Sequence, residues 1–288
     1  MKLKKIISTV LATVAAVACF AFAGCKSNKD ELKVLDTILL TEEEYAFAIN
    51  KTNSDLKTSV DAIITEMKND GSLQTLIDSY FNGEATFTYE NKTSAPAEND
   101  FVMATNAYFP PFEYYEGNKF AGIDVELASI IAQKLNKTLF VNDMDFDAIV
   151  LDVQNGNSDI GMAGMTVTDE RKEQVNFAIP YYTSAQVITV QKGDDTFKDC
   201  QTAADVEAIL NAKGSDYTVG TQTGTTGYMY SAGDEAFGYD GFASLTTKAY
   251  QTGALAMTDL SNGKINAVIL DLQPSLMITK SINENFKK

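Results

Sequence analysis

The spacing of hydrophobic residues predicts helices early in the chain. Between residues 54 and 80 apolar side chains recur every three or four positions, as on a helix with one buried face. Asp70-Gly71 interrupts the pattern and is typical of a helix end. We therefore predict one helix from about residue 53 to 70 and a second from 72 to about 81, preceded by an alternating strand at residues 45–49.

Beyond residue 100 the pattern switches repeatedly between the periods of a strand and of a helix. Such alternation is typical of an α/β fold with a parallel-cored sheet. The order restarts after residue 191, which indicates two units. We expect strands at residues 101–105, 138–141, 159–162, 186–191, 217–220 and 267–270. We expect helices at residues 124–135, 146–154, 203–212, 253–260 and 274–286.

The segment between the two early helices and the strand at 101 has a different composition. Residues 84–100 are polar, contain Pro96 and lack helical periodicity, so we predict a linker there with room for a short strand at 85–89.

Composition and charge exclude several classes of function. The chain is 45% hydrophobic and 22% charged, as expected of a folded protein, and its net charge of −16 disfavours binding to nucleic acid. It contains no histidine, the commonest general base and a frequent metal ligand. Cys200 is the only cysteine beyond residue 25, so an internal disulfide is not expected in the folded body. We expect a monomer with no metal and no cofactor.

The first residues have the pattern of an export signal. A positive start is followed by an apolar stretch from residue 6 to 23, and Phe22-Ala-Gly-Cys25 resembles a bacterial lipobox. We expect residues 1–24 to be a lipoprotein signal peptide, Cys25 to carry lipid, and residues 25–31 to form a polar tether. The mature protein would then be extracytoplasmic, anchored to the outer face of the cell membrane. Simple secretion and an uncleaved anchor are the alternatives.

Arg171 is the only arginine among 288 residues, whereas the other basic residues are lysines. A guanidinium can pair with a carboxylate through two hydrogen bonds, which an ammonium cannot do. Arg171 is therefore a candidate for a specific role. The alternative is a surface ion pair with Asp169 or Glu170, which would contribute little stability.

Four segments together resemble extracytoplasmic solute-binding proteins of the polar amino acid ABC-transporter type, family 3. They are residues 104–113, with the sequence ATNAYFPPFE, 122–126 (GIDVE), 163–171 (AGMTVTDER, with Phe177 beyond) and 267–271 (AVILD). The resemblance implies a two-lobed, periplasmic-binding-protein-like fold of type II. Each lobe would be a parallel-cored sheet flanked by helices, and two hinge strands would join them.

The order of the segments departs from that family. The block at residues 43–81 resembles the part that closes family members at their C-terminus, but here it precedes the segment that normally begins the domain. We therefore predict a circular permutation rejoined through residues 84–100. The alternative is an unrelated extra domain at residues 26–83. Permutation would place residues 45–190 in lobe 1, residues 32–44 and 191–288 in lobe 2, and the hinge near Tyr45 and 186–191.

The resemblance implies how a free L-amino acid would be held. Arg171 would bind the carboxylate, aided by Thr166 and the Gly/Thr turn at 223–226. Asp271 would accept the ammonium, helped by the Gly164 carbonyl and the Thr166 hydroxyl. Taken alone, Asp271 could equally cap the following helix, and the turn could be an ordinary loop.

The remaining implied positions concern the ligand side chain. Phe109 and Phe146 would flank its apolar part, although each could equally be a core aromatic. Asn106 and Gln222 would select its polar end, and an uncharged asparagine favours glutamine or another uncharged polar amino acid. The full set of implied site residues is Asn106, Phe109, Phe146, Gly164, Met165, Thr166, Arg171, Gln222, Thr225, Thr226 and Asp271.

The implied function is the substrate-binding subunit of an ABC importer, not an enzyme, with membrane permease subunits as partners. Two alternatives stay open: an amino-acid-sensing module of a signalling receptor, and a dehydratase-like enzyme on the same scaffold.

Overall fold

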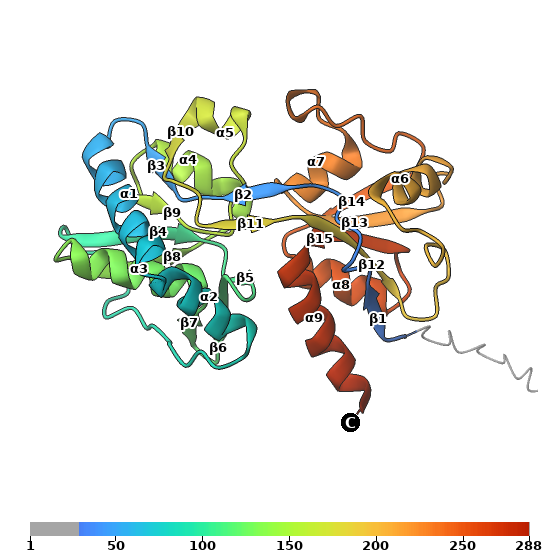
Figure 1. Ribbon diagram of the computed structural model, residues 1–288, viewed down its shortest axis with the longest axis horizontal. Coiled ribbons are helices and arrows are strands. Elements are labelled where there is room, and N and C mark those ends of the chain that lie inside the picture. The colour runs from blue at the N-terminus through green and yellow to red at the C-terminus, as the bar shows by residue number, and fades with distance from the viewer. Residues whose placement is uncertain (1–28, 288) are drawn as a thin grey trace, which may run out of the picture.

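The computed structural model describes residues 29–287, which form two lobes side by side (Figure 1). Each lobe is built on a five-stranded sheet with helices packed against it. This arrangement is the two-lobed α/β architecture predicted from the sequence. Within residues 29–287, no helix combines the length and apolar character needed to cross a membrane.

Lobe 1 is organised around strand β4, which runs parallel to its neighbours β8 and β9. β3 and β10 extend the other side of the sheet in antiparallel pairings. The strands in sheet order are β10 (Val175–Phe177), β3 (Ala48–Asn50), β9 (Ile160–Gly161), β4 (Asp100–Thr105) and β8 (Thr138–Asp143). A small separate sheet contains β5 (Tyr108–Phe109), β6 (Glu113–Glu116) and β7 (Lys119–Ala121). The helices are α1 (Ser54–Asn69), α2 (Ser72–Phe81), α3 (Ile123–Lys134), α4 (Ile149–Gln154), which follows a 3₁₀ turn at Phe146–Ala148, and α5 (Asp169–Gln174).

Lobe 2 has the equivalent plan, with β13 parallel to both of its neighbours. β12 pairs antiparallel with β15, and β1 pairs antiparallel with β12 at the sheet edge. The strands in sheet order are β1 (Leu32–Val34), β12 (Gln186–Gln191), β15 (Ala267–Asp271), β13 (Thr218–Gln222) and β14 (Thr246–Tyr250). The helices are α6 (Ala203–Asn211), α7 (Thr226–Ala232), α8 (Gly253–Ser261) and α9 (Leu272–Glu284), with 3₁₀ turns at Glu235–Phe237 and Asn285–Lys287.

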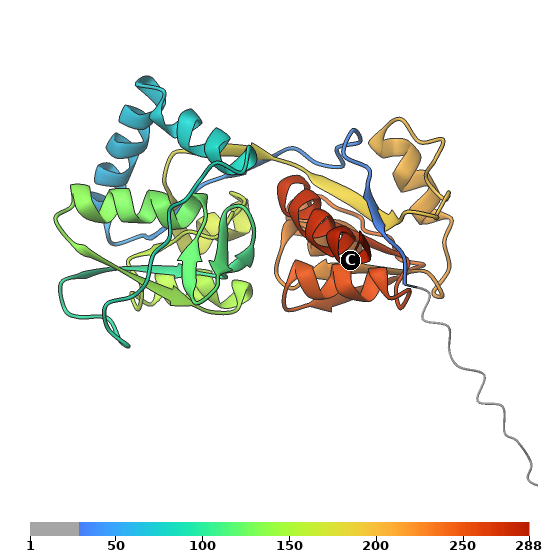
Figure 2. The same cartoon turned by 90° about the horizontal axis from the view of Figure 1, so that it is seen from below.

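Two antiparallel strands cross from one lobe to the other. They are β2 (Glu43–Tyr45) and β11 (Tyr182–Ser184), seen as blue and yellow strands in Figures 1 and 2. The predicted hinge near Tyr45 lies at this crossing. The second strand of the hinge, expected near residues 186–191, is instead β11, because residues 186–191 are bonded inside the sheet of lobe 2 as β12. The boundary of lobe 1, expected at residue 190, therefore moves back to β11.

The early block of the chain is part of lobe 1 and not a separate domain. β3 lies between β9 and β10 in its sheet, and α1 buries Val60, Ile63, Ile64 and Met67 in the same core. The predicted linker at residues 84–100 contains no helix. In place of the short strand expected at residues 85–89, it has a single β-bridge between Tyr89 and Phe120. Its Asn91 side chain bonds both backbone groups of Val141 and so covers the edge strand β8.

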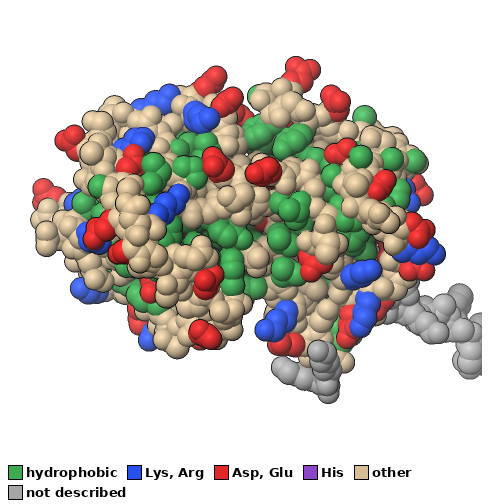
Figure 3. Space-filling model, viewed as in Figure 1, with side chains coloured by type: hydrophobic (Ala, Val, Ile, Leu, Met, Phe, Trp, Pro, Cys, Tyr) green, Lys and Arg blue, Asp and Glu red, His purple; other side chains and the backbone are tan. Residues whose placement is uncertain are grey.

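The sequence pattern missed several shorter elements. Strands β5, β6, β7 and β14 are only two to five residues long, which is too short for a periodic pattern to mark them. Charged side chains are interspersed over the face in Figure 3, and green apolar side chains lie along the seam between the lobes. One hydrophobic cluster continues across this boundary, from Phe112 in lobe 1 to Met257 and Ile278 in lobe 2. The lobes are therefore in contact.

We predict that Ile64→Ala destabilises the protein by about 2–5 kcal/mol, because Ile64 is fully buried and its loss leaves a cavity in lobe 1. Chemical unfolding would measure the change. Leu39→Ala is the control, since Leu39 is 51% exposed and the change there should cost less than about 0.5 kcal/mol. Equal effects of the two substitutions would contradict the placement of α1 in the core.

Candidate functional site

A narrow cavity of about 10 Å³ lies between the lobes. This volume is enough for about one water molecule, so the walls of the cavity are nearly in contact. Of the residues proposed from the sequence, all except Met165 line it. The lining residues are Asn106, Phe109, Glu113, Phe146, Gly164, Thr166, Arg171, Gln222, Thr225, Thr226 and Asp271. Met165 is buried beside Phe146, and its carbonyl accepts the backbone N–H of Ala46.

Arg171 is buried at the cavity wall. It lies in the first turn of α5, whose N-cap Thr168 accepts the Arg171 backbone N–H. Its guanidinium donates to the carbonyl of Thr166 at 2.7 Å and, across the lobes, to that of Gly224 at 2.9 Å. Burial lowers the pKa of Arg171 to about 10, and the charge of Glu43 opposes this shift.

The alternative of a surface ion pair does not hold for Arg171. Asp169 instead pairs with Lys172 at 2.9 Å, and the Arg171 guanidinium lies 5.3 Å from the centroid of the Phe146 ring. Among residues 29–287, no carboxylate lies within ion-pair distance of Arg171. A buried positive charge that lacks a direct counter-charge is a suitable partner for an anionic group in the cavity.

Asp271 provides the opposite charge from lobe 2. It ends β15 and occupies the N-cap position of α9, but its side chain makes no capping hydrogen bond. The hydroxyl of Tyr45 donates to its carboxylate instead. Burial, followed by the negative charge of Glu43, raises the pKa of Asp271 to about 7. The helix-cap alternative is therefore not what the structure shows.

The two aromatic residues belong to the cavity wall and to the core at once. Phe109 and Phe146 line the cavity and also pack in hydrophobic clusters of lobe 1. Phe109 lies directly over Gly164, where an added Cβ would come within 2.7 Å of the Phe109 ring. Gly164 also has a φ of +52°, which favours glycine. The close approach of ring and backbone therefore requires glycine at this position.

An amide relay crosses the cleft at the other end of the cavity. The Asn106 amide group donates to the Met144 carbonyl at 2.8 Å, and its oxygen accepts from the Gln222 amide group at 3.0 Å. Because a carbonyl can only accept, Met144 fixes which way both amides point. The Gln222 side-chain oxygen at the end of the relay is buried and has no partner among the described residues. The relay thus presents an acceptor.

Glu113 also lines the cavity, although no role was predicted for it from the ATNAYFPPFE segment in which it lies. It is fully buried, and burial, followed by the charge of Asp124, raises its pKa well above the ordinary value. Asp124 accepts the Gly164 N–H at 2.9 Å and the Tyr181 hydroxyl at 2.6 Å. Asp124 thus supports Gly164 from behind, whereas neither carboxyl oxygen of Glu113 has a hydrogen-bond partner among the described residues.

Glu43 was also missed, because it is the middle one of three consecutive glutamates. Its carboxylate accepts the hydroxyls of Thr166 at 2.6 Å and Thr226 at 2.8 Å, one from each lobe. Alternation along β2 supplied a usable signal, since it places Glu43 on the same buried face as Tyr45 and leaves Glu44 exposed.

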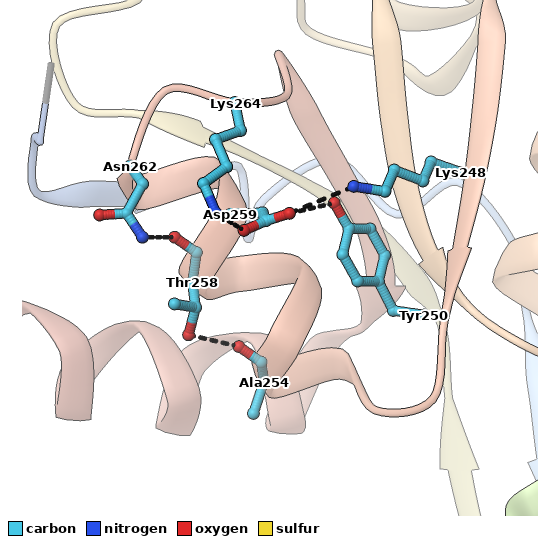
Figure 4. A network of polar contacts seen from close by, with 7 residues as sticks. All are labelled: Lys248, Tyr250, Ala254, Thr258, Asp259, Asn262 and Lys264. Atoms are coloured by element: carbon cyan, nitrogen blue, oxygen red, sulfur yellow. Dashed lines mark hydrogen bonds and ion pairs between the residues drawn. The ribbon is translucent and has the colours of Figure 1, made fainter. Parts of the chain in front are cut away.

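The loop before α7 is held from outside the cavity. Thr223 donates through its backbone N–H and its hydroxyl to the Tyr250 carbonyl, at 2.8 and 3.0 Å. The Tyr250 hydroxyl donates in turn to Asp259 of α8, which also binds Lys248 and Lys264 (Figure 4). The network pins the edge strand β14 to α8 and thereby fixes where Thr225 and Thr226 begin α7.

Comparison with known proteins gives consistent results. The model of a family described as bacterial extracellular solute-binding proteins, family 3, matches residues 101–266. The arginine-binding extracellular protein ArtP of Bacillus subtilis is 35% identical over 47% of this chain and 48% of its own length, so this match spans about half of that relative. A putative ABC transporter arginine-binding protein 2 of Escherichia coli is 31% identical over 67% of this chain and 71% of its own. The solved structure of an ancestral arginine-binding protein bound to glutamine has 32% identity and a TM-score of 0.54, covering 65% of this chain and 75% of that one.

We predict that Asp271 makes the empty protein less stable as the pH rises. Its pKa is about 7 when folded, against an ordinary value of about 3.9 when unfolded. The stabilising effect of its protonation is fully present below the unfolded pKa and is lost between about pH 4 and 7. Asp271→Asn should therefore raise the unfolding temperature more at pH 8 than at pH 5, measured by calorimetry. The exposed Asp240→Asn is the control, and an equal effect of Asp271→Asn at both pH values would contradict the assignment.

Proposed function

Because the chain belongs to the bacterial extracellular solute-binding proteins of family 3, we propose that it is the substrate-binding subunit of an amino-acid ABC importer. It binds one free polar amino acid between its closing lobes, and a glutamine-like ligand is favoured. The observation that carries the proposal is that Arg171 of lobe 1 and Asp271 of lobe 2 line one buried cavity.

The charges of a zwitterion match this pair. If either charge of the ligand were buried without a partner, its desolvation would cost more free energy than its contacts in the cavity contribute. Each charge of the ligand therefore needs its own counter-charge. In this proposal the ligand carboxylate pairs with the Arg171 guanidinium and displaces its contact with the Gly224 carbonyl. The ammonium binds at Asp271, and the rings of Phe109 and Phe146 flank the aliphatic part.

Opposite charges on different lobes also provide a closing mechanism. One small ligand can contact both only when the lobes are together, so it stabilises the closed state by its higher affinity for that state. The β2–β11 ribbon is the connection about which the lobes would move. The closed complex is then the form that membrane permease subunits recognise.

The amide relay supports a ligand side chain that ends in N–H donors. Gln222 offers a buried acceptor without a partner, which an amide or a guanidinium satisfies and a carboxylate does not. Two relatives are named for arginine, and the ancestral arginine-binding protein was solved with glutamine. We favour the neutral amide, because Asn106 and Gln222 supply hydrogen bonds without a counter-charge.

The cellular setting follows from the N-terminal sequence, which lies outside the described residues. We propose that residues 1–24 are removed, that Cys25 is lipidated, and that the monomeric protein is anchored to the outer face of the cell membrane. The permease partner and the lipid anchor are both parts of this proposal.

We also propose that the chain is a circular permutant. The family match begins at residue 101, after the block that contributes β3, α1 and α2 to lobe 1. The two ends of the described chain are adjacent, since the Asn283 side chain of α9 bonds both backbone groups of Leu32 at 2.8 and 2.9 Å. This adjacency supports the permutation, because a short connection could join the end of α9 to the segment before β1 while the chain is opened at residues 84–100.

A thermal-unfolding screen with the twenty amino acids tests the function. A ligand at 100 times its Kd should stabilise the protein by about 2.7 kcal/mol, and glutamine should stabilise it more than glutamate. Arg171→Lys should lose most of this gain, because lysine cannot form the two-bond fork. Lys172→Gln, which changes an exposed neighbour, should retain it. An unchanged gain in Arg171→Lys would exclude Arg171 as the carboxylate partner.

Moving the early block tests the permutation. A chain that runs from residue 100 to 287, then through a short flexible linker into residues 30–83, should fold and bind the same amino acid within about tenfold of the original affinity (about 1.4 kcal/mol). Deletion of residues 30–83 without replacement should abolish folding, since β3 and α1 belong to the lobe 1 core. A rearranged chain that folds but binds nothing the original binds would count against the proposal.

A further inference from the structure

Glu43 lies directly behind the cavity wall, on the hinge strand β2. Its side chain is buried, and its carboxylate accepts the hydroxyl of Thr41 on one oxygen. The other oxygen accepts the hydroxyls of Thr166 at 2.6 Å and Thr226 at 2.8 Å. Both threonines also line the cavity, so Glu43 contacts the site through them.

This arrangement determines which way the threonine hydroxyls point. A hydroxyl has one proton to donate and two lone pairs, whereas a carboxylate can only accept. Thr166 and Thr226 therefore give their protons to Glu43 and can present only lone pairs to the cavity. Thr226 also accepts from the Gln186 amide at 3.1 Å, which leaves it one lone pair.

The third cavity threonine is committed in a similar way. The Thr225 hydroxyl donates to the Gln222 carbonyl at 2.8 Å. All three hydroxyl protons are thus used within the protein. The hydroxyls are therefore not free to donate to the ligand carboxylate, as was expected from the sequence: that group must rely on the Arg171 guanidinium and on backbone N–H groups. The other expected role of the Thr166 hydroxyl, as an acceptor for the ammonium, is compatible with this arrangement.

We infer that Glu43 is a positioning residue that turns Thr166 and Thr226 into acceptors for the ligand's α-ammonium group. An ammonium has three N–H donors, and the Asp271 carboxylate with these two hydroxyl oxygens supplies three acceptors of the required kind. The cavity would therefore distinguish an amino acid from a carboxylic acid that lacks the amino group. The inference rests on the proposed function and deepens it.

The test compares ligands that differ only in the α-amino group. Binding of L-glutamine and glutaramic acid, and of L-arginine and 5-guanidinopentanoic acid, is measured by calorimetry. We expect Glu43→Gln to lower amino-acid affinity at least tenfold, because the new amide N–H₂ donates to a threonine and turns that hydroxyl's proton toward the cavity. The analogue without the α-amino group should bind no worse than it does to the unchanged protein. The selectivity ratio, which is the affinity for the amino acid divided by the affinity for this analogue, should therefore fall at least tenfold.

The matched control is Glu44→Gln, which makes the same chemical change at the exposed neighbour on β2 and should leave the ratio unchanged. Thr166→Val and Thr166→Ser give a second comparison if Glu43→Gln does not fold. The valine removes the acceptor and should reduce the ratio, while the serine keeps the hydroxyl and should preserve it.

Other results would overturn the inference. Equal loss of both ligand types in Glu43→Gln or Thr166→Val would show that Glu43 serves only to hold the hinge. An unchanged ratio in these variants would show that the hydroxyls do not bind the ammonium. If the wild-type protein binds no amino acid, the proposed function and this inference are overturned together. If the wild-type protein binds amino acids selectively but the substitutions at Glu43 and Thr166 leave the selectivity ratio unchanged, the inference alone is overturned.

Discussion

The burial of one guanidinium is the constraint on which the cleft depends. Arg171 is 6% exposed, and its direct partners are neutral carbonyls. Such a charge is tolerated in a protein interior only when negative groups surround it. Glu43 and Asp271 provide that negative field from the hinge and from lobe 2, and their charges oppose the lowering of the arginine pKa. These groups come from both lobes and from the strand between them, so the electrostatics of the site depend on how the lobes are arranged.

The two lobes also show that position along the chain and position in the fold are separate properties. β3 lies between β9 and β10 in a sheet whose other strands all begin at residue 100 or later, and β1 pairs with a strand from the other half of the chain. Sheets and helices pack according to which faces are apolar, whatever order the segments come in. The front block could therefore move within the sequence while its buried side chains kept the same neighbours.

Much of this could be predicted from the sequence, and the reasons differ by feature. Periodicity located α1 because that helix buries one apolar face, and the rarity of Arg171 directed attention to the residues of the cavity. Residues 186–191 were assigned to the hinge wrongly, because a strand that enters a sheet and one that crosses between lobes have the same pattern. Glu43 was overlooked because three adjacent glutamates look alike until a strand pairing shows which one faces inward.

The hydrogen-bonding character of the cavity is set by groups that lie one layer behind its surface. The Met144 carbonyl and the Glu43 carboxylate can only accept, so each fixes the direction of the hydrogen bonds that lead from it. The hydrogen bonds that start at the Met144 carbonyl end at the side-chain oxygen of Gln222. Those that start at the Glu43 carboxylate end at the hydroxyl oxygens of Thr166 and Thr226. Both ends are acceptors, while Arg171 has N–H groups left to donate. A ligand with donors at its amino group and side-chain end, and acceptors only at its carboxylate, satisfies this pattern. Substitutions at Met144's partner Asn106 or at Glu43 would therefore change what the cavity accepts even though its shape and its charged residues were left in place.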